Sequence, residues 1–395
     1  MDEAGHVDAG RQRSPHLIDG KPRPYLRVAN VMDGYIDTTD VKAMPFTDSE
    51  FERFKLQPGD ILLNEGQSLD LVGRPAIYKG EPSNCCFQNS LIRFRAHATT
   101  DSGFALQLFK HLMLSGRFAA IAAQTTSIAH LGVNRFASLR APFPTLPEQQ
   151  RIAAILFAWD RMIEALGALV VAKRKRRDSL RQDLLDGTRR FPEFKKRPWA
   201  TKRVGELLKS VNRYEEWDDN RIFRLAGVRR NSGGLFFRSE LLGSQIKVKV
   251  CKKIQTNDFL ISRRQITWGG MSIVPQDFNG YDVNDEYEVL CVRDGTMFDM
   301  RFFQHLSQTA ALKNLARLAS NGVFAERLRL NFDLKAFLNQ FIRIPPSKEE
   351  QLMIVSLLDA CAHEIRLLEA ELEAFKMQKR GLMEKLLTGK VRVKP

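Results

Sequence analysis

The sequence predicts an α+β protein in which two globular domains are separated by two long helices that form an antiparallel coiled coil. Three observations support this prediction: a helix start that recurs 202 positions later, an apolar period of about 3.5 residues after each start, and a mixed segment before each helix. The predicted order is a first domain over residues 1–144, a first helix over 145–190, a second domain over 191–346 and a second helix over 347–390.

The recurring segment has the pattern of a helix N-terminus. Its two copies read PTLPEQQRIAAIL from Pro144 and PSKEEQLMIVSLL from Pro346. Each copy contains [ST]-x-x-E, in which a hydroxyl residue stands three positions before Glu148 or Glu350. This spacing is typical of a capping box, which satisfies free backbone amides at a helix start. The sequence therefore predicts two helices that begin in the same way.

Apolar residues then recur in steps of four and three in both copies, which is the mark of a coiled-coil seam. The predicted seam residues are Ile152, Leu156, Trp159, Ile163 and Leu166 in the first copy and Ile354, Leu358, Ile365, Leu368 and Leu372 in the second. Each run ends at a glycine suited to a C-terminal cap. A helix of about forty residues is about 60 Å long and cannot bury its own seam. Packing of the two helices on each other is expected, and separate oligomer contacts are the alternative.

The first helix carries a basic interruption, KRKRR, over residues 173–177. It places Lys173 and Arg177 at seam positions. A solvated face or a local opening of the coiled coil would explain it structurally, and a contact with phosphate or a partner would explain it functionally.

The segments before the two helices share a layout but few residues. YLRVANV from Tyr25 resembles FRLAGV from Phe223, and LQPGDILL from Leu56 resembles IQTNDFLI from Ile254. In both segments a polar turn leads into an apolar strand, and a helical stretch and a polar loop follow, with the later helix predicted from Met297. We expect one shared scaffold that carries two different binding domains, with drift after duplication as the alternative.

The charge balance favours a polyanion as partner. The net charge is +15 and the pI is about 9.7, which is typical of nucleic-acid-binding proteins, although a merely basic soluble protein is the alternative. The excess is +6 over residues 148–197 and +7 over 198–346, against +1 for each of the two remaining segments. The first domain is therefore not expected to bind phosphate through bulk charge.

The sequence further predicts a soluble cytoplasmic protein. No run of eighteen apolar residues and no charged-then-apolar leader is present, so neither a membrane span nor export is expected. The five cysteines form no Cys-x-x-Cys pair and are odd in number, which favours reduced thiols.

Catalytic and metal-binding motifs are not found. The sequence has no P-loop, no Gly-x-Gly-x-x-Gly after a strand, no His-Glu-x-x-His and no Asn-Pro-Pro-aromatic stretch of an amino-group methyltransferase. The acidic stretch over 282–288, with Asp282, Asp285 and Glu286, could hold a divalent ion. A surface turn and an edge strand explain it more simply. No catalytic residue and no metal ligand is predicted.

Polar loops in the two domains instead carry residue types that read base edges, because Arg pairs with guanine and Asn or Gln with adenine. The candidate DNA-binding residues are Asn64, Gln67, Arg74, Gln124, Thr126 and His130 in the first domain, and Arg263, Arg264, Gln265, Trp268, Asn321, Arg327 and Arg329 in the second.

The complete pattern resembles the specificity (S) subunits of type I restriction–modification systems, the HsdS family. The resemblance rests on PFPTLPEQQRIAAIL and IPPSKEEQLMIVSLL at the helix starts, LRQDLLDG and LMEKLLTG at the helix ends, and FPEFKKRPWATKRVGEL between the first helix and the second domain. It covers nearly the whole chain. One departure is that the opening WATKRVGELL of the second domain has no counterpart in the first, which could therefore be shortened.

The resemblance implies two target-recognition domains, each reading one half of a split site in double-stranded DNA, with the helix pair setting their separation. It also implies two methyltransferase (M) subunits and restriction (R) subunits as partners. S-adenosylmethionine, ATP and Mg²⁺ would belong to those partners, and this chain would bind no cofactor. A coiled-coil scaffold that binds only protein, and a self-contained nuclease or methyltransferase, are the alternatives.

Overall fold

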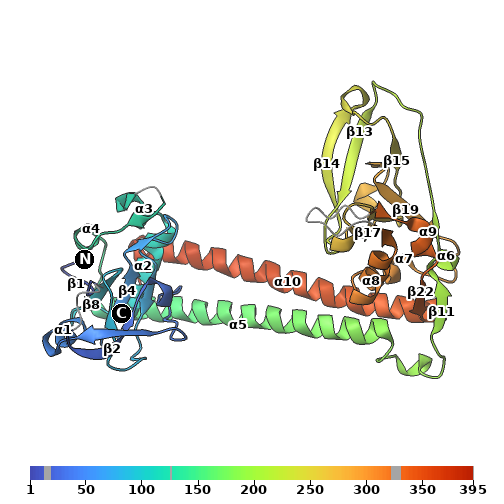
Figure 1. Cartoon of the computed structure of the whole chain (residues 1–395). Coiled ribbons are helices and arrows are strands. Elements are labelled where there is room, and N and C mark those ends of the chain that lie inside the picture. The colour runs from blue at the N-terminus through green and yellow to red at the C-terminus, as the bar shows by residue number, and fades with distance from the viewer. Residues whose placement is uncertain (13–18, 125–126, 322–330, 395) are drawn as a thin grey trace. The chain divides into compact units, whose positions relative to one another are not determined.

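The computed structural model describes residues 1–12, 19–124, 127–321 and 331–394, and it divides into two compact units. The first unit contains Met1–Leu169 and Leu368–Pro395, and the second contains Val170–Leu367. Two long helices, α5 (Leu146–Asp186) and α10 (Lys348–Leu387), each contribute one part to each unit. The predicted helices over 145–190 and 347–390 therefore correspond to α5 and α10 (Figure 1).

Over its described residues, the first unit contains three small sheets and four α-helices besides its parts of α5 and α10. Its main sheet has the order β1-β8-β4-β6, a second has the order β3-β2-β7, and a third has the order β5-β10-β9. The strands are β1 (Gly5–Ala9), β2 (Lys21–Leu26), β3 (Lys42–Phe46), β4 (Ile61–Asn64), β5 (Gly66–Gln67), β6 (Pro75–Ile77), β7 (Cys86–Phe87), β8 (Leu91–Ala96), β9 (Ala123–Gln124) and β10 (Ala129–His130). The helices are α1 (Asp48–Phe54), α2 (Ser102–Leu114), α3 (Arg117–Ile121) and α4 (Val133–Ala137).

The second unit repeats this plan with additions. Its two four-stranded sheets have the orders β12-β19-β16-β17 and β14-β13-β18-β15, and two pairs, β11-β22 and β20-β21, complete it. The strands are β11 (Ala200–Arg203), β12 (Leu208–Ser210), β13 (Ile222–Val228), β14 (Leu235–Leu242), β15 (Cys251–Lys253), β16 (Phe259–Ser262), β17 (Met271–Ile273), β18 (Asp282–Asn284), β19 (Tyr287–Val292), β20 (Ser320–Asn321), β21 (Asn331–Phe332) and β22 (Phe341–Ile344). The helices are α6 (Val204–Leu207), α7 (Met300–Ser307), α8 (Ala310–Leu318) and α9 (Leu334–Leu338).

The two domains share a topology, as their layout in the sequence predicted. In both, one strand lies between an antiparallel neighbour and a parallel one: β2 between β3 and β7, and β13 between β14 and β18. In both, the strand after the polar turn, β4 or β16, pairs antiparallel with two neighbours of the main sheet. The divergent sequences therefore specify the same scaffold.

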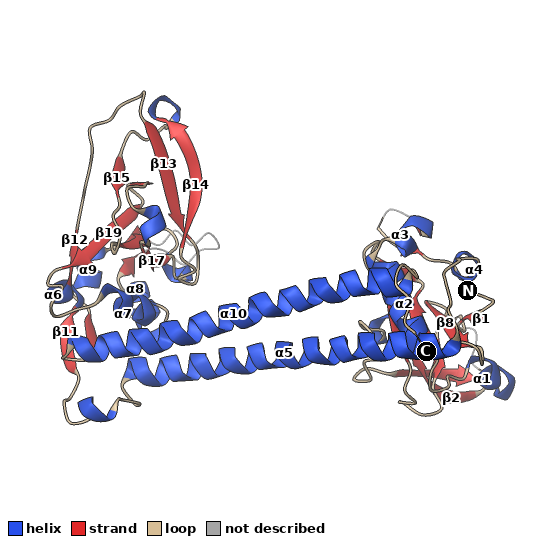
Figure 2. Cartoon of the chain, turned by 180° about the vertical axis from the view of Figure 1, so that it is seen from behind, coloured by secondary structure: helices blue, strands red, loops and turns tan. Residues whose placement is uncertain are grey.

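Within each unit the parts of α5 and α10 run antiparallel, and both views show them side by side (Figure 2). In the first unit the rings of Trp159 and Phe375 meet edge to face with centroids 5.8 Å apart. Lys379 on α10 is buried and donates to Asp160 Oδ1 of α5 at 2.5 Å, and its desolvation lowers the pKa of the ammonium. In the second unit Lys173 pairs with Glu364, also at 2.5 Å.

The predicted seam residues are all buried or half-buried. Five are less than 5% exposed, and five are partly covered. The buried group is Ile152, Leu156, Ile354, Leu358 and Ile365, and the half-buried group is Trp159, Ile163, Leu166, Leu368 and Leu372. Burial is deepest where the helices also contact a domain core, as Ile152 and Leu156 do in the first unit.

The Glu-Gln pair that follows each helix start has two separate tasks. Gln149 accepts from the Asp101 amide at 2.9 Å and donates to the carbonyls of Thr99 and Pro144. Gln351 repeats this with the Asp299 amide at 3.0 Å and two further carbonyls. Both glutamines are buried, so each fixes its helix start to the domain that precedes it.

The preceding glutamates hold arginines instead of closing capping boxes. Glu350 accepts from Arg190 at 2.8 and 2.7 Å and from the Trp199 indole at 3.3 Å, while Glu148 accepts from Arg392 at 2.8 and 2.6 Å. Ser347 Oγ still accepts from the Glu350 amide at 3.4 Å, so only half of that box forms. The prediction of a reciprocal box was wrong, because a bidentate guanidinium binds the carboxylate more strongly than one backbone amide does.

Two smaller expectations also need correction. The helical stretch predicted from Met297 is two helices, α7 and α8, separated by a break at Thr309, whose side chain caps α8. The acidic stretch predicted as an edge strand contains β18, which lies inside its sheet between β13 and β15. Its neighbours are distant in the sequence, so local patterning did not reveal them.

Candidate nucleic-acid interface

Three of the first-domain candidates lie on one small sheet. Gln67 on β5 and Gln124 on β9 are both cross-strand partners of Ala129 on β10. Directly opposed residues project from the same face of a sheet, so the two glutamines share a face. His130 follows on β10, and its Nδ1 lies 3.0 Å from Glu65 Oε2. Because adjacent residues of a strand point to opposite faces, the small sheet places the two amides on one face and the imidazole on the other.

Asn64 and Arg74 lie deeper than a base-reading role requires. Asn64 is fully buried, and within the described parts of the chain neither amide atom of its side chain has a hydrogen-bond partner. The Nε of half-buried Arg74 is likewise buried and has no hydrogen-bond partner among the described residues. An unsatisfied buried polar group costs about 1–3 kcal/mol. In this structure Asn64 therefore faces the interior and not a ligand.

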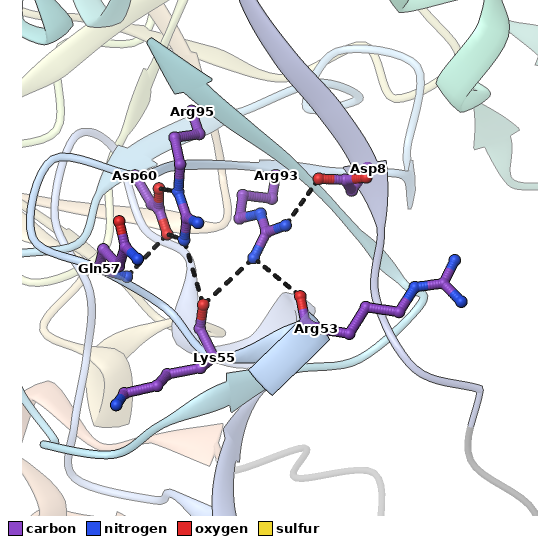
Figure 3. A network of polar contacts seen from close by, with 7 residues as sticks. All are labelled: Asp8, Arg53, Lys55, Gln57, Asp60, Arg93 and Arg95. Atoms are coloured by element: carbon purple, nitrogen blue, oxygen red, sulfur yellow. Dashed lines mark hydrogen bonds and ion pairs between the residues drawn. The ribbon is translucent and has the colours of Figure 1, made fainter. Parts of the chain in front are cut away.

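An arginine network fixes the polar turn that leads into β4 (Figure 3). Arg95 donates two hydrogen bonds of 2.7 Å to Asp60, and Asp60 also accepts from the Gln57 amide at 2.8 Å. These bonds raise the pKa of the Arg95 guanidinium. Arg93 donates to Asp8 at 2.6 Å and to the carbonyls of residues 53 and 55. Both arginines are thus engaged within the domain.

The second domain uses the same device in its corresponding turn. Asp258 is buried and accepts from Arg213 at 2.6 and 3.1 Å and from the Gln255 amide at 2.7 Å. The matching motifs LQPGD and IQTND therefore encode a structural turn, and neither Asp60 nor Asp258 is offered to a ligand.

The second-domain candidates surround a short 3-10 helix, η4 (Ile266–Trp268). Arg263 donates to buried Glu288 at 2.6 Å, whereas Arg264 is 74% exposed and pairs with Glu286 at 2.6 Å. Gln265 is half-buried and precedes η4, and Trp268 is 48% exposed. An exposed indole can stack on a base, and an exposed guanidinium can donate to a base edge.

A loop that the sequence reading missed completes this surface. The loop over residues 229–234 joins β13 to β14, and its Arg230 guanidinium lies 5.1 Å from the centroid of the Trp268 ring. The amide of Asn231 donates to the Trp268 carbonyl at 2.6 Å, and that of Ser232 donates to the Gly269 carbonyl at 2.7 Å. Both donors have left-handed backbones, with φ of 56° and 53°. We call Arg230, Asn231, Arg264 and Trp268 the second-domain surface.

The remaining candidates are placed incompletely. Thr126, Arg327 and Arg329 lie outside the described residues. Asn321 lies on β20, opposite Asn331.

The acidic stretch is neutralised by neighbouring cations. Asp282 is buried and pairs with Arg221 at 2.7 Å, although burial still raises its pKa. Asp285 pairs with Lys252 at 3.1 Å. Over the described ranges, no group of three or more His, Cys, Asp or Glu is placed to hold a metal ion. Nor does any helix there combine the length and the hydrophobicity that a bilayer span would need.

Comparison with known proteins agrees with this architecture. Residues 19–169 match the family model of the type I restriction modification DNA specificity domain. A putative type I restriction enzyme MjaX specificity subunit of Methanocaldococcus jannaschii is 24% identical over 94% of this chain and 88% of its own length. The MjaVIII specificity subunit of the same organism is 25% identical over 73% of this chain and 71% of its own.

Solved structures of such subunits share the fold. The HsdS subunit from Thermoanaerobacter tengcongensis has a TM-score of 0.57 at 18% identity, and the type I S subunit from M. genitalium has one of 0.54 at 15% identity. Each comparison covers 98% of this chain and at least 94% of the other. The chain thus contains a type I restriction modification DNA specificity domain over residues 19–169, and along nearly its whole length it is similar to type I restriction–modification specificity subunits.

Proposed function

We propose that each globular domain reads one half of a bipartite site in double-stranded DNA, and that the helix pair sets the spacer between the halves and docks two methyltransferase subunits. Restriction subunits complete the assembly in this proposal. The chain itself catalyses nothing, and S-adenosylmethionine, ATP and Mg²⁺ are bound by the partner subunits. The matched specificity domain and the similarity to type I specificity subunits support this division of labour.

One observation carries the proposal: two domains of the same topology present different surface chemistry. The first offers Gln67, Gln124 and His130 on a small sheet, and the second offers an exposed indole with exposed arginines. A protein that needed only to bind partner proteins symmetrically would have no use for unlike surfaces on like scaffolds. Reading of two different half-sites requires them.

The lengths of the helices support the spacer role. Helix α5 has 41 residues, which corresponds to about 60 Å at 1.5 Å per residue. Duplex DNA repeats every 34–36 Å or so, and a rigid connection between two readers fixes the spacing of their half-sites.

The test uses the chain assembled with methyltransferase subunits from the same genome. Duplexes of random sequence are methylated, and the modified sites are identified by sequencing. We expect one bipartite motif, and a double variant, Arg230→Ala with Trp268→Ala, should relax only one half of it. Loss of these contacts should lower methylation of duplexes that carry the original motif by about 10- to 100-fold, because a good base contact contributes about 1–3 kcal/mol.

A matched control removes an exposed aromatic residue and an exposed arginine from strand β14 of the same domain, as Phe237→Ala with Arg238→Ala. It should leave both halves unchanged. A scaffold without DNA readout would give no motif, and a self-contained enzyme would methylate or cleave DNA without the partner subunits. Either result contradicts the proposal.

A further inference from the structure

A basic groove lies along the C-terminal part of α5 in the second unit. It has a volume of about 910 Å³ and is formed by the last turns of α5 and the segment over 188–195. Its lining carries Lys175 and Arg176 from the helix and Arg189 and Lys195 from the segment that follows. All four are exposed.

The charge of this groove is not compensated. Arg190 also lines it, but its guanidinium is held by buried Glu350 at 2.7 Å. Among the residues that the structure describes, Lys175, Arg176, Arg189 and Lys195 have no carboxylate within ion-pair distance, and Asp183 is the one acidic residue of the lining. The groove therefore has a net charge of about +3, which outweighs the partial charge of about −0.5 at a helix C-terminus.

Comparison of the two copies of the repeat shows which of these cations the packing of the helices requires. Arg190 recurs 202 positions later as Arg392, and both arginines hold the glutamate at the start of the other helix. The three groove cations Lys175, Arg176 and Arg189 correspond instead to Met377, Gln378 and Val391. Since the second copy forms its helix end without them, helix packing does not require them.

We propose that this groove binds the phosphate backbone of double-stranded DNA without regard to sequence. The inference rests on the proposed function for its partner and adds a contact outside the reading surfaces. Long, exposed cations at one end of a helix suit a row of phosphates, because a duplex carries one negative charge per 1.7 Å or so of its axis. The corresponding positions of the second copy, Met377, Gln378 and Val391, are neutral. The proposed contact therefore belongs to the first copy, at the end of α5.

The test measures how DNA affinity depends on salt for the chain in complex with methyltransferase subunits. The groove variant combines Lys175→Gln, Arg176→Gln and Arg189→Gln. The matched control also removes three exposed helix cations, as Arg161→Gln, Arg366→Gln and Arg380→Gln. Affinity for a duplex with the target site and for one without it is measured by fluorescence anisotropy between 50 and 200 mM salt, a range chosen because phosphate contacts are salt-sensitive there.

Loss of three phosphate contacts lowers the slope of log affinity against log salt by about 2.7. Between 50 and 200 mM salt the affinity of the unmodified complex should therefore fall by a factor about 40 times larger than that of the groove variant. The difference should be the same for both duplexes. The control should retain the original slope. The methylated sequence should stay the same in both variants.

An unchanged slope in the groove variant overturns the proposed contact, while a preserved preference for the target duplex shows that sequence reading is intact. Failure of the unmodified complex to prefer any duplex would instead count against the proposed function. A groove variant that keeps its slope but no longer assembles with methyltransferase subunits would identify the groove as a site for an acidic protein surface.

Discussion

At the scale of single residues, the two glutamates at the helix starts connect the sequence repeat to the packing of the helices. Glu350 is 1% exposed and Arg190 is 11% exposed, so this ion pair is largely shielded from water. Glu148 is also covered, but its partner Arg392 is 68% exposed. Removing one member of a shielded pair leaves the other charge without compensation, whereas an exposed arginine is readily solvated.

Glu350→Gln should therefore lower the free energy of unfolding by about 3 kcal/mol, the lower end of the range for breaking a buried pair. Glu148→Gln should cost less. Chemical denaturation followed by circular dichroism checks the order of the two variants. An equal loss in both, or a larger loss for Glu148→Gln, would contradict the difference in shielding.

The Glu148 pair also predicts a dependence on pH. Hydrogen bonds from Arg392 hold the pKa of the Glu148 carboxyl below its ordinary value of 4.5. A carboxyl whose pKa is lower in the folded state stabilises the fold above its unfolded value, and this contribution is lost as the pH falls through the folded value. The difference between the unmodified chain and Glu148→Gln should therefore shrink as the pH falls below 4.5.

At the scale of secondary structure, the sequence predicts elements that depend on local patterns, but it does not predict contacts between residues that lie far apart in the chain. The apolar period located α5 and α10 because every turn of a packed helix repeats the same requirement. The loop over 229–234 was missed because it meets Trp268, which lies more than thirty positions away. Its Asn-Ser-Gly-Gly turn was the available signal. The sequence predicts Asn64 as a base-reading residue because a polar residue at the end of an apolar run gives no indication of burial, whereas the structure buries it in β4.

The helix pair predicts how the spacer responds to length. A heptad inserted after Leu169 and another after Leu367 lengthens both helices by about 10 Å while the seam keeps its register. The spacer of the methylated motif should grow by about three base pairs, since a duplex rises 3.4 Å or so per base pair. Binding should weaken, because three extra base pairs rotate the half-sites around the duplex axis by about 100°.

Sequencing of methylated DNA from the lengthened complex checks this prediction. Replacing the same heptads without insertion is the control, and it should leave the spacer unchanged. A lengthened pair that still methylates the original spacer would exclude the helices as the element that sets the distance.

At the scale of the whole molecule, the chain combines one repeated scaffold with two domains that differ in surface chemistry. At both helix starts the glutamate accepts from an arginine and the glutamine accepts from the backbone amide of an aspartate. The candidate DNA-binding residues, in contrast, are not repeated between the two domains. Domains fixed to a common scaffold in this way should be exchangeable one at a time, provided that the residues at the helix starts are kept.

Domain replacement tests this claim most directly. Residues 200–344 are exchanged for the corresponding domain of a type I specificity subunit with a different target, and the motif methylated by the assembled complex is sequenced. One half of the motif and its spacer should stay the same, and the other half should become that of the donor. A motif in which both halves change, or neither does, would contradict the reading of one half-site by each domain.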